Sequence, residues 1–454
     1  MLRAVARAPR GVCVRQAVVS TRGASWASSG GEQASSAPAV PSPPEPIDSS
    51  LLASFKRGAG GRASYSGNVV TVFGATGFLG SAVISRLAKD GSQLIIPYRC
   101  DAFWIRELQL LGELGQILFF PFQLKDEDSI RKLVKYSNVV INLIGRDYET
   151  SNFHYEDVHV EGARRLARVS REMGVRRFIH VSAMNAATDL EPKLAPGGSL
   201  YLKTKALGER AVREEFPDAT IVRPADMYGN APDRFLTTFL ALSRMTFTNI
   251  ELYRRGEHTY KMPVSVIDVS KGLQKILQNP SLDGHTYEFV GPYCYRLDEL
   301  VKFMKYYAGR PDVGEGMFKR VLKGYSPYIR FIISWYEMRN RVLRRQSLFN
   351  WDMLERLEAV SDVLTGCPTL RDVGVTELYN IEHGGRRAMQ QYNARNFKTY
   401  YYWEAPPERE PCPKVAPLRR RDLKMDMVDI EESPFTMGKL DRGMALGAEH
   451  STVP

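Results

Sequence analysis

A turn spaced by three glycines constrains this chain more than any other feature of its sequence. The segment VVTVFGATGFLG (residues 69–80) joins a β-branched run to a helix-like run through Gly74, Gly77 and Gly80. Gly74 permits a tight turn, Gly77 allows a pyrophosphate to approach the backbone, and Gly80 allows the helix to pack on the strand. The first amides of such a helix are free to bind an anion. We therefore expect a dinucleotide site; the alternative is a turn with a purely structural role.

The context of the turn favours the dinucleotide. It closes a strand–helix–strand unit of 30 residues, from Val69 to Tyr98. The loop and the first helical turn supply the expected cofactor-binding residues Gly74, Thr76, Gly77, Phe78, Leu79 and Gly80.

The pattern of apolar residues predicts the fold class. From Asn68 onward, short β-branched runs alternate with amphipathic stretches, which is typical of a parallel sheet covered by helices. The expected strands are Val69–Phe73, Gln93–Pro97, Ile117–Phe120, Asn138–Leu143, Arg177–Ser182 and Thr220–Val222. The expected helices are Phe78–Lys89, Asp126–Tyr136, Val158–Met173 and Leu202–Glu215. We predict an α/β fold, a doubly wound Rossmann-type parallel sheet at residues 65–290, with a smaller mixed or helical region at 291–403.

The residues after the second expected strand indicate the form of the nucleotide. A site that prefers NAD places an acid here to bind the ribose hydroxyls, whereas this chain has Arg99. A guanidinium can bind a 2′-phosphate through two hydrogen bonds, so NADP(H) is the expected cofactor. The alternative is that Arg99 is a solvated loop residue and Asp101 serves as the acid.

A tyrosine and a lysine four residues apart add candidate catalytic groups. Tyr201 and Lys205 would share one face of a helix, about 19 residues after Ser182 ends the fifth expected strand. A nearby ammonium would lower the tyrosine pKa, so that the phenol could exchange a proton with a carbonyl or alcohol bound by Ser182. With 22 tyrosines in the chain, one such pair is expected by chance, so its position in the order of motifs carries the argument.

Further polar and glycine residues complete this order. The segment NLIG brings Asn142 and Gly145 to the end of the fourth strand, where the nicotinamide half should lie, and Pro224 follows the sixth strand within RPADMYG. The set resembles the extended and atypical short-chain dehydrogenase/reductase superfamily over residues 68–290. In that superfamily the Gly-x-x-Gly-x-x-Gly turn, the Tyr-x-x-x-Lys pair and the Arg-Pro-x-x-x-Tyr-Gly segment recur, and this chain matches all three.

A narrower resemblance spans most of residues 65–405. Its segments are RFIHVSAMNA (177–186), residues 201–229, DRFL (233–236), PVSVIDVSKG (263–272), GVTELY (374–379) and TYYYWE (399–404). They are similar to the NAD(P)H-binding, dehydrogenase-like accessory subunits of mitochondrial respiratory complex I. The resemblance implies a tightly held NADPH that orders the fold, other complex I subunits as partners, a place on the matrix side of the inner membrane, and no established turnover.

Two departures from the active enzymes put catalysis in doubt. Where those enzymes usually have Asn-Val-x-Gly in the helix after NLIG, this chain has His159 in place of the asparagine. Ala183 follows Ser182, and no Val-Tyr-Gly segment comes next, as it does in many sugar-nucleotide enzymes. Neither departure affects the phosphate-binding turn. The expected role is therefore a structural NADPH site, and the rival is an active NADP-dependent reductase or epimerase that uses Ser182, Tyr201 and Lys205.

The N-terminal segment has the composition of a mitochondrial transit peptide. Residues 1–31 contain five arginines and no acid, and they lack a secretory apolar core. A chloroplast address or a disordered basic tail are the alternatives. The net charge of +11 falls to about +6 without this segment, which is an ordinary surface balance. Residues 32–64 form a linker rich in Pro, Ser and Gly, which we expect to be extended.

The remaining patterns exclude several classes of protein. No run of 18 apolar residues predicts a membrane-spanning helix. Five scattered cysteines without a Cys-x-x-Cys pair argue against a disulfide framework, and histidine spacing argues against a metal site. The basic and aromatic residues 319–345 fit contact with inner-membrane lipid or a partner subunit, or an ordinary helix. No nucleic-acid-binding module accompanies them, so we expect no nucleic-acid partner. Residues 404–454 are read as an extended charged tail.

Overall fold

The computed structural model describes residues 64–390, with gaps at 151, 196, 230–232, 234, 237, 241–251, 308–330, 332, 336 and 340–349. The predicted transit peptide, the linker before Ser64, most of residues 319–345, the TYYYWE segment and the charged tail lie outside the described residues.

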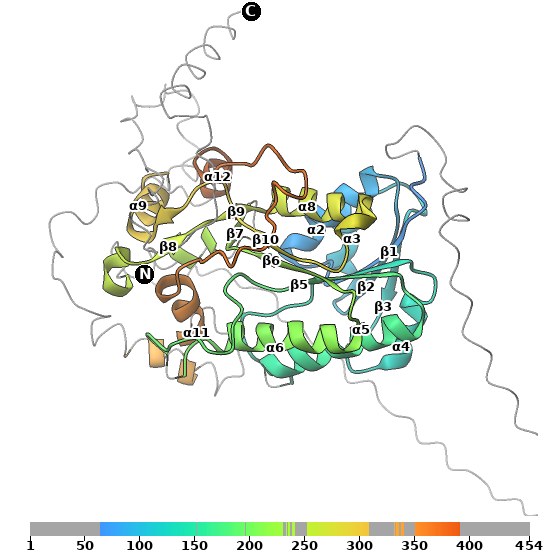
Figure 1. Cartoon of the computed structure of the whole chain (residues 1–454), viewed down its shortest axis with the longest axis horizontal. Helices are drawn as coiled ribbons and strands as arrows, with labels where there is room; N and C mark the ends of the chain where they lie inside the picture. Colours follow the sequence, from blue (N-terminus) through green and yellow to red (C-terminus); the bar gives the residue numbers. More distant parts are fainter. Residues whose placement is uncertain are drawn as a thin grey trace, which may run out of the picture. The chain divides into compact units, whose positions relative to one another are not determined.

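A seven-stranded sheet, parallel throughout, lies at the centre of the described chain (Figure 1). Its strands are β1 (Val69–Phe73), β2 (Gln93–Tyr98), β3 (Ile117–Pro121), β4 (Val139–Asn142), β5 (Arg177–Val181), β6 (Thr220–Pro224) and β10 (Thr286–Phe289). They are ordered β10-β6-β5-β4-β1-β2-β3. This order confirms the predicted doubly wound fold. The six predicted strands are confirmed within two residues at each end, and β10 adds a seventh beside β6.

Helices cover both faces of the sheet (Figure 1). On one face lie α4 (Glu127–Val134), α5 (Gly162–Glu172) and α6 (Leu200–Glu215); on the other lie α2 (Phe78–Lys89) and α8 (Val266–Gln278). Successive strand residues serve opposite faces. In β4, for example, Val140 packs in the core beneath α4 and α5, whereas Val139 and Ile141 pack beneath α2 and α8. Apolar positions spaced by three and four residues, such as Leu79, Val83 and Leu87 in α2, turn one helix face inward.

One predicted helix has a different start. We expected a single helix from Val158 to Met173, but a π-helical turn, η2 (Asp157–Glu161), precedes α5. Gly162 joins the two, where an added Cβ would meet the Leu124 side chain at 2.7 Å. The turn positions Val158 and His159 inward beside α6, which brings His159 into the site described below.

The strand order reverses between β1 and β4. Strand β1 pairs with β2 on one side and with β4 on the other, and Phe73 lies opposite Asn142 at their carboxyl ends. Chain crossovers leave this point in opposite directions, which opens a crevice outside the carboxyl ends of the strands. The glycine turn after β1 and the NLIG segment after β4 both meet there.

The chain after β6 builds a second, smaller core. This core takes side chains from α9 (Leu297–Tyr307), α11 (Trp351–Leu354) and α12 (Ile381–Gln390). Two short strand pairs, β7 (Met227–Tyr228) with β9 (Val264–Ser265) and β8 (Tyr260–Lys261) with β11 (Tyr295–Arg296), contribute side chains to both cores. Leu364, Leu370 and Val375 return to the main core beneath α8. Among the described residues, no helix combines the length and apolar character needed to cross a membrane.

Candidate nucleotide site

The glycine turn forms an open cradle at the start of α2. Gly74 has a φ of +82°, and a Cβ there would lie 2.8 Å from the Leu143 carbonyl carbon, so both the conformation and the close approach of the two loops require glycine. Gly77 is the N-cap of α2 and provides no side-chain capping bond. Because the first amides of a helix lack intrahelical partners, this N-terminus can accept an anion. Thr76 and Gly77 are exposed, Phe78 is half-buried, and Leu79 is buried in the core.

Three cations gather beyond the end of β2. Arg99 stands with its guanidinium 5.4 Å from the Phe153 ring centroid, and the Lys125 ammonium lies 4.9 Å from the same centroid. Burial lowers the pKa of Arg99, and the charge of Arg146 lowers it further. In the part of the chain that the structure describes, none of these three cations has a carboxylate within ion-pair distance. An incoming anion would relieve this repulsion.

Asp101 caps the short turn that follows Arg99 and Cys100. Its carboxylate accepts a hydrogen bond from the Phe103 amide at 3.2 Å and caps a short 3₁₀ turn, η1 (Ala102–Ile105). This engagement weighs against the alternative in which Asp101 binds the ribose hydroxyls. Sequence reasoning identified Arg99 but missed Lys125 and Arg146, which come from two other loops.

Hydrogen bonds of the buried Asn142 side chain fix the end of β4. Asn142 is 1% exposed, and its Oδ1 accepts from the Ile144 amide at 3.0 Å. This bond fixes the amide orientation, so Nδ2 donates to His180 Nδ1 at 3.1 Å. Both ends of the Asn142 amide are therefore bonded within the protein, whereas we had expected this side chain to face the nicotinamide. Gly145 is exposed at the site, and its missing side chain leaves room for the Lys205 ammonium, which lies 3.1 Å from the position of a Cβ.

Tyr201 and Lys205 occupy the first two turns of α6. Lys205 is 3% exposed, and its ammonium donates to the Val181 carbonyl at 3.1 Å, at the end of β5. Burial lowers the pKa of Lys205 to about 8. The ammonium lies 6.0 Å from the Tyr201 ring centroid. The expected depression of the Tyr201 pKa is not found, because burial raises that pKa and Arg356 is the group that most opposes the rise.

Ser182 follows β5 directly. Its side chain is 4% exposed, and its Oγ is buried without a hydrogen-bond partner among the described residues. Pro224 ends β6 in the neighbouring position, where its carbonyl accepts from the Met184 amide at 2.9 Å. The fold thus brings all the predicted site residues to the carboxyl edge of one sheet.

His159 is a site residue whose role the sequence did not reveal. Its Nε2 accepts from the Arg146 amide at 3.2 Å, and its Nδ1 lies 2.9 Å from the Thr204 hydroxyl, which itself donates to carbonyls of α6. These partners require a neutral ring with the proton on Nδ1. Burial, helped by the charge of Lys205, holds the pKa of His159 well below its usual range. The ring meets the edge of Tyr201 at 5.2 Å between centroids.

The C-terminal region also reaches the site. Asp352 accepts from the Tyr201 amide at 3.2 Å, and the Arg356 guanidinium lies 4.5 Å from the Tyr201 ring centroid. These residues come from α11 and the π-helical turn η5 (Glu355–Ala359) that continues it. No sequence pattern singled out Arg356, which lies between two buried leucines, Leu354 and Leu357.

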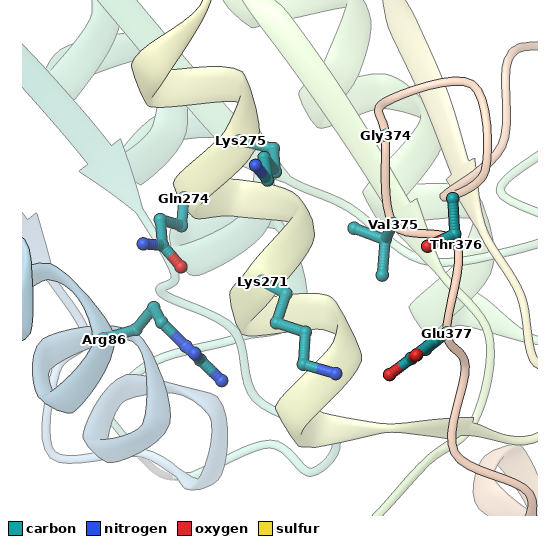
Figure 2. A pocket seen from close by; sticks show the side chains of 8 residues that line it. All are labelled: Arg86, Lys271, Gln274, Lys275, Gly374, Val375, Thr376 and Glu377. Atoms are coloured by element: carbon teal, nitrogen blue, oxygen red, sulfur yellow. The ribbon is translucent and has the colours of Figure 1, made fainter.

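A shallow hollow elsewhere on the surface does not belong to this site. Arg86, Lys271, Gln274, Lys275 and residues 374–377 line it, and Figure 2 shows the Lys271 side chain extending toward Glu377. Lys271 already pairs with Asp268 at 3.1 Å and lies over the Tyr379 ring. Arg86 is near the far end of α2, more than two turns from the phosphate cradle at its start.

Comparison with known proteins agrees with this geometry. Residues 70–289 match the model of the NAD dependent epimerase/dehydratase family, which supports a nicotinamide dinucleotide as the ligand of the cradle. A rat protein, NADH dehydrogenase [ubiquinone] 1 alpha subcomplex subunit 9, mitochondrial, is 45% identical over 332 residues, covering 72% of this chain and 82% of the rat protein.

More distant relatives fall in two groups. The NADH-ubiquinone oxidoreductase 40 kDa subunit of Neurospora crassa mitochondria is 34% identical over 356 residues, covering 78% of this chain and 86% of that subunit. A ceramide reductase of Caulobacter vibrioides is 34% identical over only 182 residues, covering 39% of this chain and 51% of the reductase. The resemblance to the complex I subunits is thus confirmed over most of both chains, and the chain belongs to the short-chain dehydrogenase-like family of NADH dehydrogenase [ubiquinone] 1 alpha subcomplex subunit 9.

Proposed function

We propose that this chain is a non-catalytic accessory subunit of mitochondrial complex I that holds NADPH to stabilise its fold and its assembly. One observation carries the proposal: the phosphate end of the crevice is open and uncapped, whereas at the tyrosine end Lys205 is buried and bonded to the Val181 carbonyl and the Ser182 hydroxyl is buried. In this proposal residues 65–290 form the NADP(H)-binding domain.

The cation cluster supports NADPH over NADH. Arg99, Lys125 and Arg146 surround the Phe153 and Tyr148 rings beyond β2, where the adenosine half of the nucleotide would lie. A 2′-phosphate would satisfy charges that lack a carboxylate partner among the described residues. Gly74, Thr76, Gly77, Phe78, Leu79 and Gly80 would hold the pyrophosphate, with Gly145, Ser182, Tyr201, Lys205 and Pro224 around the nicotinamide half.

The names of the relatives support the partners and the location. The rat and Neurospora proteins are named as mitochondrial subunits of NADH dehydrogenase. We infer the same complex for this chain, on the matrix side of the inner membrane, with other complex I subunits as its partners. NADPH would supply a hydride donor when bound. In this proposal it instead stabilises the fold, because it binds the folded chain and not the unfolded chain. At a thousandfold excess of free ligand over Kd, such binding stabilises a fold by about 4 kcal/mol.

A charge placed at the N-cap of α2 tests the proposal. Gly77 has a φ of −81°, which any residue adopts, and an added Cβ has only the Gly74 carbonyl nearby, at 3.2 Å. Aspartate is a favourable N-cap, so Gly77→Asp should preserve the helix while its carboxylate repels the pyrophosphate. Gly77→Asn has nearly the same size and capping ability without the charge, and it is the matched control.

The two variants should differ in nucleotide content, melting temperature and assembly. We expect Gly77→Asp to retain less than a tenth of the nicotinamide nucleotide found on the wild-type protein, to melt at a lower temperature and to assemble poorly into complex I on native gels. Gly77→Asn adds a side chain of the same size without the charge, so it should lose less nucleotide than Gly77→Asp, and the difference between the two measures the charge repulsion. A Gly77→Asp protein that lacked NADPH yet assembled and melted like the wild type would refute the stabilising role. Wild-type protein purified without any nicotinamide nucleotide would refute the site.

A further inference from the structure

We propose that Arg356 determines what the site accepts: its guanidinium covers Tyr201 where a carbonyl substrate would have to bind, so that a dinucleotide is the only ligand. Arg356 is carried by a C-terminal strap, residues 350–363, that includes α11 and η5. The proposal rests on the function proposed above, because it explains why a chain with Ser182, Tyr201 and Lys205 would hold a nucleotide without turning over a substrate.

Tyr201 is partly exposed, and three side chains lie against its ring. The Arg356 guanidinium lies 4.5 Å from its ring centroid, the His159 ring meets it at 5.2 Å and the Tyr155 ring at 6.3 Å, both nearly perpendicular. A guanidinium over a tyrosine face is a favourable contact, stronger when it is shielded from water. Arg356 therefore occupies one face of the ring, and aromatic neighbours limit the approach from the edges.

The buried Ser182 hydroxyl is a second observation against a bound carbonyl substrate. In a reductase of this type a substrate oxygen would accept hydrogen bonds from both the serine and the tyrosine hydroxyls. The Ser182 Oγ is buried, and no described residue bonds it. The hydroxyl is therefore both unsatisfied by the described residues and out of contact with the surface. A carbonyl substrate could contact the Ser182 hydroxyl only after the surrounding protein moved.

One anchor of the strap precedes Arg356 by a single residue. The Glu355 carboxylate is buried and accepts hydrogen bonds from the backbone amides of Lys193, Leu194 and Ala195, the last at 2.9 Å. The Lys193 ammonium returns a bond to the Ala359 carbonyl at 3.0 Å. These amides belong to the loop between β5 and α6, which joins Ser182 to Tyr201. The strap thus binds the loop that would border a substrate.

A second anchor lies after Arg356. Asp362 accepts from the Met262 amide at 2.9 Å and from the Asn185 side chain at 3.2 Å, while Asn185 accepts from the Val363 amide at 3.0 Å. The buried Lys261 ammonium lies 3.5 Å from Asp362 and 3.1 Å from the Arg356 carbonyl. Because the strap is bonded on both sides of Arg356, the closed arrangement is the resting state of the fold.

Charge also favours the closed position. Burial disfavours the cation of Arg356, but Tyr201 and the carboxylates of Asp226 and Asp147 outweigh that effect, so the pKa of Arg356 is raised above its usual value. The guanidinium therefore remains charged beside Tyr201.

Hydroxyl-radical footprinting of the full-length protein tests the proposal, because side-chain oxidation reports solvent access. Tyr136, whose exposed fraction is 67%, is the internal reference, and Arg131→Ala on the surface of α4 is the matched control. Each variant is measured with NADPH bound and again with Gly77→Asp, which removes shielding by the nucleotide. We expect the oxidation of Tyr201 relative to Tyr136 to rise at least threefold in Arg356→Ala and to stay constant in Arg131→Ala.

The outcomes separate this proposal from the proposed function. A folded Arg356→Ala protein with an unchanged Tyr201 ratio overturns the role of Arg356, whether or not NADPH is bound. If Arg356→Ala does not fold, the wild type decides: oxidation of Tyr201 as fast as that of Tyr136 overturns closure, and slow oxidation with Gly77→Asp supports it. Absence of NADPH from the wild type is a failure of the proposed function alone.

Discussion

The two ends of the crevice differ in whether their polar groups have hydrogen-bond partners within the protein. At the phosphate end, Thr76 and Gly77 are exposed, the N-terminus of α2 has no side-chain cap, and Arg99 lacks a carboxylate partner within the described chain. At the tyrosine end, Lys205 is bonded to the Val181 carbonyl and His159 has a partner on each ring nitrogen. The first end has free amides and, among the described residues, unpaired cations, whereas at the second Lys205 and His159 already have partners within the protein.

This difference shows how one fold can keep binding without keeping chemistry. Phosphate binding depends on backbone amides and glycine spacing, which persist as long as the strand, turn and helix form. Proton transfer depends on side chains that must remain accessible and have pKa values near the working pH. Here burial raises the pKa of Tyr201, which makes the phenolate less available.

The largest effect is expected from filling the contact between α2 and the glycine turn. A Cβ on Gly80 would lie 2.1 Å from the Ala75 carbonyl oxygen, so Gly80→Val must displace the turn or the helix. We expect a loss of about 3 kcal/mol or more in the free energy of unfolding, together with the loss of bound nucleotide. Urea unfolding of the full chain measures the first, and fluorimetry of extracted nucleotide measures the second.

Gly115→Ala is the matched control for this variant. Gly115 has a φ of +79° with no atom within 4 Å of an added Cβ, so its cost should come from backbone strain alone, about 1 kcal/mol. If Gly80→Val unfolded at the same urea concentration as the wild type, the phosphate end would not depend on this close packing.

Acid should act first on the tyrosine end. Burial lowers the pKa of His180 to about 3, and the neighbouring Lys205 charge adds to the shift. Since the unfolded chain takes up a proton near pH 6.5 and the folded chain does not, the stability contributed by neutral His180 is complete above pH 6.5 and declines toward pH 3. The loss should reach about 2 kcal/mol at pH 5 from this residue alone.

Histidine variants locate the source of this acid sensitivity. Thermal unfolding between pH 7 and pH 5 should show a shallower decline in His180→Gln, because a glutamine oxygen can still accept from Asn142. His154→Gln is the control, since His154 is an exposed side chain on the surface and its loss should leave the slope unchanged. An equal decline in all three proteins would place the acid-sensitive groups elsewhere.

Nucleotide preference tests the open end directly. Arg99→Ala should weaken NADPH binding at least tenfold relative to NADH, because a charged hydrogen bond to the 2′-phosphate is lost. Arg106→Ala is the control, as the Arg106 guanidinium lies over the exposed Phe103 ring, 5.0 Å from its centroid. Kd values from calorimetry on nucleotide-stripped protein provide the measurement. If the ratio of the Kd values for NADPH and NADH did not change, the cation cluster would not select the 2′-phosphate.

The same contrast explains what the sequence could predict. The cradle is a local feature, since the strand, turn and helix lie within residues 69–89, and the spacing of glycines and apolar residues is enough to place all three. The predicted helix Phe78–Lys89 is confirmed at both ends. The strand β10 was missed because its four residues have only Tyr287 and Phe289 as apolar side chains and follow a region without clear alternation.

The tyrosine end depends on contacts that no local pattern records. The Tyr201 amide bonds Asp352, 151 positions later in the chain, and the Ala195 amide bonds Glu355, 160 positions later. These carboxylates precede and begin a π-helical turn, where spacing rules for α-helices do not assign a face. The cation cluster likewise combines three loops after β2, β3 and β4, so only the first member was recognised from its place after a strand.

The smallest effect is expected from Tyr201→Phe, and that is why it is informative. The substitution keeps the ring beneath Arg356 and beside His159, so packing is preserved and the free energy of unfolding should change by less than about 1 kcal/mol. If the chain only holds NADPH, nucleotide content, assembly and respiration should match the wild type. An active reductase would instead lose a hundredfold or more of an NADPH-dependent turnover, because its proton donor is gone. Assays of mitochondria that carry Tyr201→Phe, with Tyr136→Phe as the exposed control, therefore decide whether the tyrosine end retains chemistry or serves only to close the site.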